Sequence, residues 1–324
     1  MTLASQRGPV ICVCGPTASG KSSLADKLAQ RLSSSVISVD AMQVYRGMDI
    51  GTAKLTPEQR RAPLLMVDVV DPDQEFSVAD FQRLARREID CLLDKSQVPV
   101  LCGGTGLYLD AVIDDMDFPR GGRLTDSRQN YERMAQSDGS HALYELLQQR
   151  DPESAELIHI NNTRRIIRAL ELCDEGKSYA QRTKEGLKAH SPYYSYYMWA
   201  VVLPKEQLYE RINTRVDEMF DEGLVQEVEQ LERRYAFSST PTASQAIGYK
   251  ELVRYMEGNY SLQEAKEAIK QASRRYAKRQ LSWIRRDGRA RTLDLSRMSE
   301  SEALESILTA ISSDDGHKET DGSN

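Results

Sequence analysis

The chain contains several short apolar runs, and segments with helical periodicity lie between them. The runs cover residues 10–14 (VICVC), 36–40 (VISVD), 64–70 (LLMVDVV), 98–102 (VPVLC) and 196–203 (YYMWAVVL). Their length and composition are typical of buried strands. Strands that alternate with helices predict an α/β fold with a doubly wound parallel sheet flanked by helices.

The middle of the chain departs from this pattern. Residues 118–195 are polar and charged and contain no convincing strand. We therefore expect a helical insertion domain here, between a first part of the core at 1–117 and a second part at 196–297. Residues 298–324 form an acidic tail that we expect to be partly disordered, from 314 onwards. Helices are expected at residues 78–93, 261–283 and 299–311.

The stretch GPTASGKS, residues 15–22, is the strongest short motif. Gly15, Gly20, Lys21 and Ser22 match the phosphate-binding loop G-x-x-x-x-G-K-[ST], and the loop lies between a predicted strand and a predicted helix. The glycines let backbone N–H groups converge on an anion, and the helix N-terminus adds partial positive charge. Lys21 adds a full charge, and the Ser22 hydroxyl suits Mg²⁺. A phosphate site is therefore predicted in a P-loop NTPase-like sheet.

Composition limits the class of protein. The chain has 324 residues, 40% of them hydrophobic, and no apolar run approaches membrane-spanning length. Residues 1–9 contain no apolar signal core, so we expect a cytoplasmic protein without membrane contact. The five cysteines form no C-x-x-C pair and the four histidines show no metal-ligand spacing. Reduced core thiols are expected.

Charge is distributed unevenly. The net charge is −6, but residues 271–297 carry nine Lys and Arg against two Asp, and residues 298–324 carry one Lys against seven acids. The acidic tail hides a basic segment of +7 in the total. Such a segment indicates either a nucleic-acid site or a solvated helix face.

A phosphate-binding loop alone is compatible with kinases, NTPases and other phosphate-handling proteins. The strand at 98–102 ends in GGTGLY, where an NTP-hydrolysing protein usually has a Walker-B aspartate. Asp40 ends the strand at 36–40 and so lies at the ligand-binding edge of the sheet. There its carboxylate could bind Mg²⁺, act as a base or cap the next turn.

Several long motifs follow one another along residues 10–286. They are GPTASGKS (15–22), SVDAMQVYRGMDIGTAK (38–54), GGTGLYLDA (103–111), DPESAELIHINNTRRIIRALE (151–171), LYERINTRVDEMFDEGLVQEV (208–228), QAIGYKE (245–251) and YAKRQLSWIRR (276–286). In this order they resemble the tRNA dimethylallyltransferases, also called tRNA isopentenyltransferases. The chain departs from the family pattern at Ala41, where Ser is more common, and at INN (160–162), where PND is usual.

The resemblance implies a reaction. The family transfers a dimethylallyl group from dimethylallyl diphosphate to N6 of the adenosine 3′ of the anticodon in tRNA and releases diphosphate. Asp40 is then the general base, and Thr17 lies near the bridging oxygen of the leaving group. Arg215 is the extra cation on the diphosphate, with Arg211 as the alternative. The diphosphate-binding loop consists of Gly15, Pro16, Thr17, Ala18, Ser19, Gly20, Lys21 and Ser22, with Mg²⁺ held through Ser22.

The resemblance also implies contacts with the anticodon stem-loop. Candidate tRNA-binding residues are Asp40, Ala41, Met42, Gln43, Thr105, Arg128, Arg164, Arg165, Ile166, Ile167 and Arg168. The alternative for the arginines near 168 is a helix face paired with Glu171. The basic segment adds Arg275 and Arg279, one helical turn apart. We expect the tRNA between the insertion and this helix, and no harm from removing the tail after Arg297.

Other classes remain open at this point. An adenylate isopentenyltransferase acting on free nucleotide would need neither the insertion nor the basic segment. A kinase conflicts with the GGTGLY strand end. A non-catalytic RNA-binding protein conflicts with the intact set of Asp40, Lys21 and Ser22. A monomer is the default expectation.

Overall fold

A computed structural model describes residues 7–116, 118, 126–188 and 192–318. The chain forms two compact units: a core composed of residues up to Ile113 and from Tyr193 onwards, and an insertion, Asp114–Pro192. The sequence indicated 118–195 for the insertion. In the described part of the chain no helix is long and apolar enough to cross a membrane.

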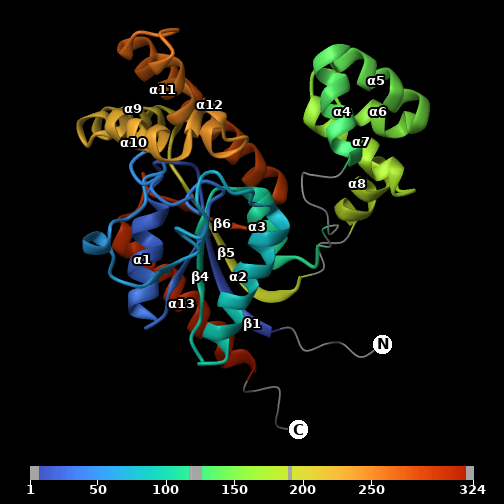
Figure 1. Ribbon diagram of the computed structural model, residues 1–324. Helices are drawn as coiled ribbons and strands as arrows, with labels where there is room; N and C mark the ends of the chain where they lie inside the picture. The colour runs from blue at the N-terminus through green and yellow to red at the C-terminus, as the bar shows by residue number, and fades with distance from the viewer. Residues whose placement is uncertain (1–6, 117, 119–125, 189–191, 319–324) are drawn as a thin grey trace. The chain divides into compact units, whose positions relative to one another are not determined.

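The core contains a six-stranded sheet in the order β3-β2-β4-β1-β5-β6 (Figure 1). All five strand pairs are parallel, which confirms the predicted α/β class. The strands are β1 (Arg7–Cys14), β2 (Val36–Val39), β3 (Leu64–Leu65), β4 (Val100–Gly103), β5 (Tyr194–Val202) and β6 (Arg291–Asp294).

Two strands differ from the sequence prediction. The apolar run 64–70 forms a strand only at Leu64–Leu65, because Met66 and Asp68 have φ angles of 60° and 55° and turn the backbone out of the sheet. The edge strand β6 was not predicted. It has only four residues, RTLD, in a charged segment, and of these only Leu293 is buried.

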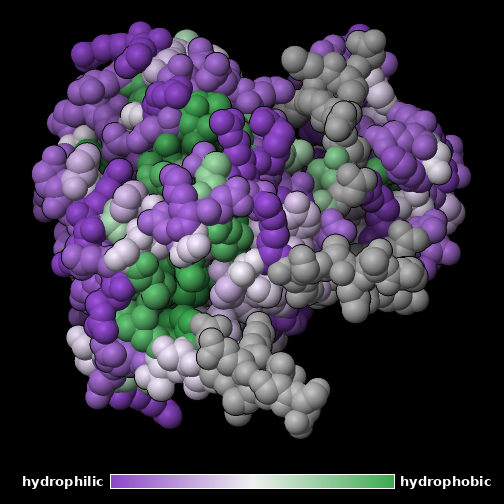
Figure 2. All heavy atoms as spheres, turned by 90° about the horizontal axis from the view of Figure 1, so that it is seen from below, coloured by the Kyte–Doolittle hydropathy of each residue, from purple (hydrophilic) through white to green (hydrophobic). Residues whose placement is uncertain are grey.

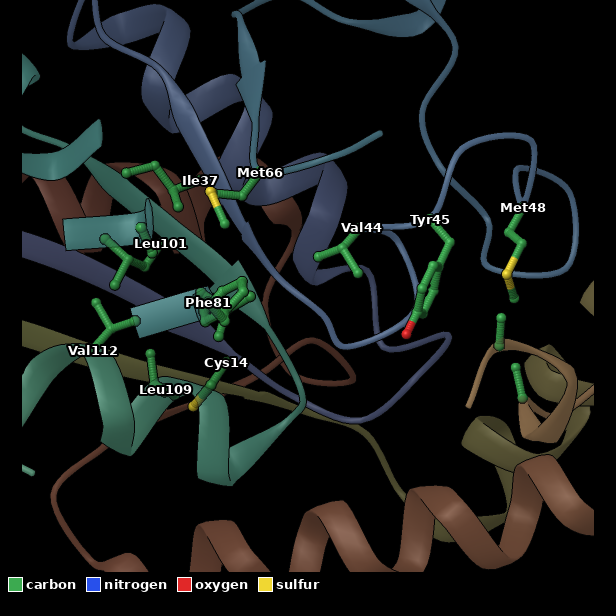
Figure 3. Packing of buried hydrophobic residues seen from close by; sticks show 14 of the residues in the cluster. Cys14, Ile37, Val44, Tyr45, Met48, Met66, Phe81, Leu101, Leu109 and Val112 are labelled. Atoms are coloured by element: carbon green, nitrogen blue, oxygen red, sulfur yellow. The ribbon is translucent and has the colours of Figure 1, made fainter. Parts of the chain in front are cut away.

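Side chains alternate between the two faces of the sheet, and helices cover both. Figure 3 shows one face, where Cys14, Ile37 and Leu101 pack near Phe81 of α2 (Val78–Leu93) and Leu109 of α3 (Gly106–Ile113). The other face packs against α1 (Lys21–Arg31) and α13 (Glu300–Lys318). The core is therefore a three-layer sandwich. The surface seen in Figure 2 is mostly hydrophilic, with apolar areas between the hydrophilic side chains.

The end of the chain is not a loose acidic tail. Ala303, Leu304, Ile307 and Ile311 of α13 are buried in the same cluster as Leu24 and Leu28 of α1. Lys27 pairs with Glu300 and Arg31 with Glu305. The helix continues to Lys318, past residue 314 from which we expected disorder; 319–324 lie outside the described residues. The expectation that truncation after Arg297 is harmless is also wrong, since it removes part of the core.

Further helices lie at the carboxyl ends of the strands, which in Figure 1 is the upper end of the core. α12 matches the predicted basic helix and begins at its cap Ser261, whose side chain accepts a hydrogen bond from the N–H of Glu264. These elements are α9 (Lys205–Asp221), α10 (Leu224–Tyr235), α11 (Tyr249–Met256) and α12 (Leu262–Asp287), with short 3₁₀ turns at Pro57–Gln59, Phe237–Ser239 and Ala243–Gln245.

The insertion is helical and has its own small core of Leu143, Leu147, Ile158, Ile166 and Leu170. Its helices are α4 (Asp126–Ser137), α5 (Gly139–Arg150), α6 (Pro152–Leu157), α7 (Thr163–Asp174) and α8 (Tyr179–Lys188). The N–H of Tyr193 donates to the carbonyl of Ile113 over 2.8 Å, so the core segments on either side of the insertion are hydrogen-bonded to each other.

Candidate active site

The phosphate-binding loop connects β1 to α1. It turns tightly at Gly15, where a Cβ would lie 2.7 Å from the Val201 carbonyl oxygen, and at Gly20, whose φ is 97°. Lys21, the first residue of α1, donates to the carbonyl of Pro16 over 3.2 Å. Burial lowers the pKa of Lys21. The loop therefore presents a desolvated cation and a helix N-terminus to the same space, a favourable environment for an anion.

Thr17 is held from two sides. Its N–H donates to Oε1 of Gln280 on α12 over 2.9 Å, and its Oγ1 accepts from Nη1 of Arg215 on α9 over 3.0 Å. Burial lowers the pKa of Arg215, while the nearby Asp40 carboxylate opposes that shift. Of the two arginines considered from the sequence, Arg215 contacts Thr17, whereas Arg211 is exposed.

Asp40 directly follows β2 and is partly exposed. Its Oδ1 accepts from the N–H groups of Met42 (2.8 Å) and Gln43 (3.3 Å). The capping role considered from the sequence is thus present in the fold. Among the residues that the structure describes, no hydrogen bond to Oδ2 is found, and Asp40 lines both cavities described below. One carboxylate oxygen fixes the turn and the other is available to a ligand.

The segment after Asp40 is anchored at several points. The Gln43 side chain accepts from Ser38 (2.7 Å) and donates to the carbonyl of Thr52 (3.0 Å). The Glu227 carboxylate on α10 accepts from the N–H groups of residues 49, 50 and 51 at 2.7–3.2 Å, and from the Tyr249 hydroxyl at 2.6 Å. Most of these hydrogen bonds satisfy partly buried polar groups, so they stabilise the conformation of the segment.

Lys54 ends this segment and is itself buried, with 3% of its side chain exposed. Its Nζ donates to the carbonyl of Tyr45 and to the carboxylates of Asp49 and Asp68 at 2.6–2.8 Å. A buried ammonium is tolerated only when it is paired in this way. Lys54 therefore stabilises the segment that follows Asp40 and is not a candidate ligand-binding residue.

Two cavities meet at Thr17, Asp40, Thr52, Arg215 and Tyr276. The first, called the polar cavity below, has Lys21, Ser22 and Ser38 on part of its lining and the apolar side chains of Val36, Leu55 and Leu64 on another part. The second, of about 420 Å³, is bordered by the apolar side chains of Met42, Ile212, Val216, Met219, Ala246, Ile247 and Ile269. A molecule with an anionic group in the first cavity and an apolar group in the second would therefore have the bond between these two groups beside Asp40.

Tyr276 was not singled out from the sequence, although it opens the YAKRQLSWIRR motif. Its hydroxyl lies 3.4 Å from Oγ1 of Thr105, the threonine of GGTG. Burial and the negative charge of Asp40 raise the pKa of Tyr276 to about 12. Gln280, one turn further along α12, was missed as well. Both lie in a long charged helix, where their neighbours across the fold cannot be inferred from spacing.

No cluster of three or more His, Cys, Asp or Glu that could hold a metal occurs among the described residues. Ser22 and Asp40, however, both line the polar cavity. Mg²⁺ commonly takes only one or two protein oxygens together with waters and phosphate oxygens. These residues fit an ion that is bound with a diphosphate and do not form a metal cage by themselves.

The predicted tRNA contacts fall into two groups. The side chains of Ile166 and Ile167 are buried in the core of the insertion, so they are not available to an RNA. Arg128 and Arg168 both pair with Glu171 at 3.3 Å, and the Arg128 side chain is only 13% exposed. The Glu171 pairing considered from the sequence is thus present at Arg168, and the structure adds the same partner for Arg128.

The remaining arginines present their charge to solvent. Arg164 and Arg165 are exposed on α7, and Arg275 and Arg279 on α12. The Arg279 guanidinium lies 5.5 Å from the centre of the Tyr276 ring and borders the apolar cavity. Ala41, Met42 and Thr105 also border this cavity, whereas the amide of Gln43 is occupied by Ser38 and Thr52.

A phosphate-binding loop on a parallel sheet, joined to an apolar cavity and a carboxylate, defines a group-transfer site rather than an NTP hydrolase. The chain matches the family model for IPP transferase over residues 43–287 and that for isopentenyl transferase over residues 9–62. It belongs to the tRNA dimethylallyltransferase family.

Relatives cover nearly the whole chain. The tRNA dimethylallyltransferase of Carboxydothermus hydrogenoformans is 43% identical over 302 residues, which span 93% of this chain and 96% of that protein. The tRNA dimethylallyltransferase of Moorella thermoacetica is 44% identical over 296 residues, 89% of this chain and 90% of that protein.

Solved structures agree with this assignment. The tRNA delta(2)-isopentenylpyrophosphate transferase of Staphylococcus epidermidis superposes with a TM-score of 0.69 at 37% identity, covering 94% of this chain and 99% of that one. A eukaryotic dimethylallyltransferase acting on tRNA superposes with a TM-score of 0.78 at 27% identity, covering 94% and 80%.

Proposed function

We propose that this chain transfers a dimethylallyl group from dimethylallyl diphosphate to N6 of the adenosine on the 3′ side of the anticodon in tRNA and releases diphosphate. The single observation that carries the proposal is the meeting of a polar, cationic cavity with an apolar one at Thr17, Asp40 and Arg215. The names of the relatives support the choice of substrates.

The diphosphate occupies the polar cavity in this proposal. Backbone N–H groups of the loop, Lys21 and Arg215 bind its oxygens, and Thr17 lies at the oxygen that bridges to the allyl carbon. Ser22 would hold Mg²⁺, which neutralises part of the diphosphate charge when bound. These groups stabilise negative charge that grows on the diphosphate as the C–O bond breaks, the stage at which electrostatic help lowers a barrier most.

The acceptor is a poor nucleophile, because the N6 lone pair of adenine is delocalised into the ring. As N6 bonds to the allyl carbon, the C–O electron pair leaves with the diphosphate and an N6 proton passes to Oδ2 of Asp40. The adenine must be turned out of the anticodon loop to reach this carboxylate, as base-modifying enzymes generally require. The apolar cavity around Met42 and Val216 accommodates the five-carbon chain.

The tRNA needs a surface beyond this cavity. We propose that Arg275 and Arg279 on the core and Arg164 and Arg165 on the insertion bind its phosphates. All four are exposed. We expect a cytoplasmic monomer.

The decisive experiment incubates purified protein with dimethylallyl diphosphate and either tRNA or AMP, and follows the product by mass spectrometry. A mass increase of one isopentenyl group on an adenosine beside the anticodon, with AMP unchanged, supports the proposal. Modified AMP would instead favour an adenylate isopentenyltransferase. ATP hydrolysis without prenyl transfer would favour a kinase or NTPase.

A further inference from the structure

Gln280 lies buried on α12, between the phosphate-binding loop and the glycine turn after β4, with 5% of its surface exposed. Its Oε1 accepts from the N–H of Thr17 over 2.9 Å, and its Nε2 donates to the carbonyl of Gly104 over 3.0 Å. The Gln280 amide thus connects α12 to the segments that follow two neighbouring strands, β1 and β4.

The glycine turn is shaped to admit this amide. A Cβ on Gly104 would lie 2.1 Å from Nε2 of Gln280 and 2.7 Å from the carbonyl oxygen of Gly15. Any larger residue at position 104 would displace the Gln280 side chain or the loop itself. The GGTG sequence therefore provides room for a side chain from α12 as well as for a substrate.

Thr17 is the residue that this arrangement fixes. In a phosphate-binding loop, backbone N–H groups usually point at the anion. The N–H of Thr17 is instead bonded to Gln280, so the position of Thr17 is set by α12 before a diphosphate binds. Its Oγ1 in turn accepts from Arg215.

We infer that Gln280 is a positioning residue for the leaving group: it holds Thr17, and through it the Thr17–Arg215 pair, at the junction of the two cavities. This inference rests on the proposed function. It also couples the site to α12, the helix that carries Arg275 and Arg279. Misplacing a catalytic group by about 1 Å can cost as much as 10²-fold in rate.

Only certain side chains can fill this role. An amide offers one donor and one acceptor, and both are used here. A carboxylate at this position accepts from Thr17 but cannot donate to Gly104. A protonated carboxylic acid can do both. Gln280→Glu should therefore be impaired when ionised and recover when protonated, which a residue that merely fills space would not do.

The test compares the kcat of Gln280→Glu and Gln280→Met with that of the wild type at saturating tRNA, between about pH 5 and 8.5. The ordinary pKa of a glutamate carboxyl is about 4.3, and burial raises it toward this range. Gln271→Glu is the matched control, because it makes the same change on the exposed surface of α12. Dividing each rate by the wild-type rate removes the pH dependence of groups that all the variants share.

We expect Gln280→Met to lose about 10- to 100-fold in kcat at every pH. Gln280→Glu should lose as much near pH 8 and regain at least severalfold relative to the wild type toward pH 5, while Gln271→Glu stays level. Gly104→Ala places a methyl group where the Gln280 amide lies and so displaces it. This variant should lose kcat as Gln280→Met does. The affinity for tRNA should remain within a few-fold in all variants.

Two outcomes would overturn the inference. One is wild-type kcat near pH 8 in folded Gln280→Met or Gln280→Glu. The other is a Gln280→Glu to wild-type ratio that is low and flat with pH. If Gln280→Met does not fold, the pH dependence of Gln280→Glu decides alone. Failure of the wild type to transfer dimethylallyl to tRNA would count against the proposed function and not against the position of Gln280.

Discussion

Asp40→Asn separates the two tasks of the Asp40 side chain. Asn keeps an Oδ1 that can accept from the N–H groups of Met42 and Gln43, so the turn should persist. The atom that changes is Oδ2, for which no hydrogen bond is found among the described residues, on a side chain that lines both cavities. The substitution therefore removes proton acceptance and leaves the local fold in place.

The expected loss follows from the chemistry of the step. A positioned base contributes roughly 10²- to 10⁴-fold to such a reaction, so kcat should fall by at least about 10²-fold. Removing the carboxylate also removes one cause of the raised pKa of Tyr276, but that hydroxyl remains protonated at neutral pH. The affinity for tRNA should stay within a few-fold, because Asp40 is a small part of the RNA surface.

The assay is a single-turnover measurement with saturating tRNA and dimethylallyl diphosphate, together with tRNA binding and thermal unfolding. Asp73→Asn is the matched control, since it neutralises an exposed carboxylate that lines neither cavity. A folded Asp40→Asn protein that keeps more than about a tenth of the wild-type kcat would refute the general-base role.

Three further predictions concern other parts of the molecule. Ile307→Ala should reduce the free energy of unfolding by about 2–5 kcal/mol, because Ile307 is fully buried, whereas Ser306→Ala on the exposed side of α13 should change it by less than about 0.5 kcal/mol; urea titration measures both. Combined Arg275→Ala and Arg279→Ala should weaken tRNA binding and reduce the slope of log K against log salt by about one to two, with dimethylallyl diphosphate affinity unchanged; an equal slope would make these arginines a solvated helix face. Lys21→Ala should abolish measurable dimethylallyl diphosphate binding in calorimetry; if the variant still binds, the diphosphate is not held by the loop. The wild type should not consume ATP.

Sequence reasoning predicted the parts of the fold that depend on local pattern. The helix at 78–93 was predicted with the observed bounds, and strands were predicted at or near the positions of β1, β2, β4 and β5. It overextended β3, because the left-handed backbone at Met66 and Asp68 leaves no signal in an apolar run. It missed β6, whose burial depends on its neighbour β5 rather than on its own composition.

The site shows the same division. The phosphate-binding loop and Asp40 could be singled out as candidates because they lie in short motifs. Gln280 and Glu227 were not, because each acts on segments far away in the sequence, Gln280 across 263 residues to Thr17. A helix at 299–311 was predicted, but its packing into the core was not, because acidic residues dominate the composition of α13 while its apolar side packs against α1.

The hydrogen bond between Tyr193 and Ile113 has a consequence for how such a chain can be altered. The core segments on either side of the insertion already meet, so the sheet does not depend on the segment between them to bring its strands into register. The entropy of closing a loop grows only with the logarithm of its length. We therefore expect that the insertion can be shortened or exchanged with little effect on core folding, and that the proposed tRNA contacts at Arg164 and Arg165 would be exchanged with it.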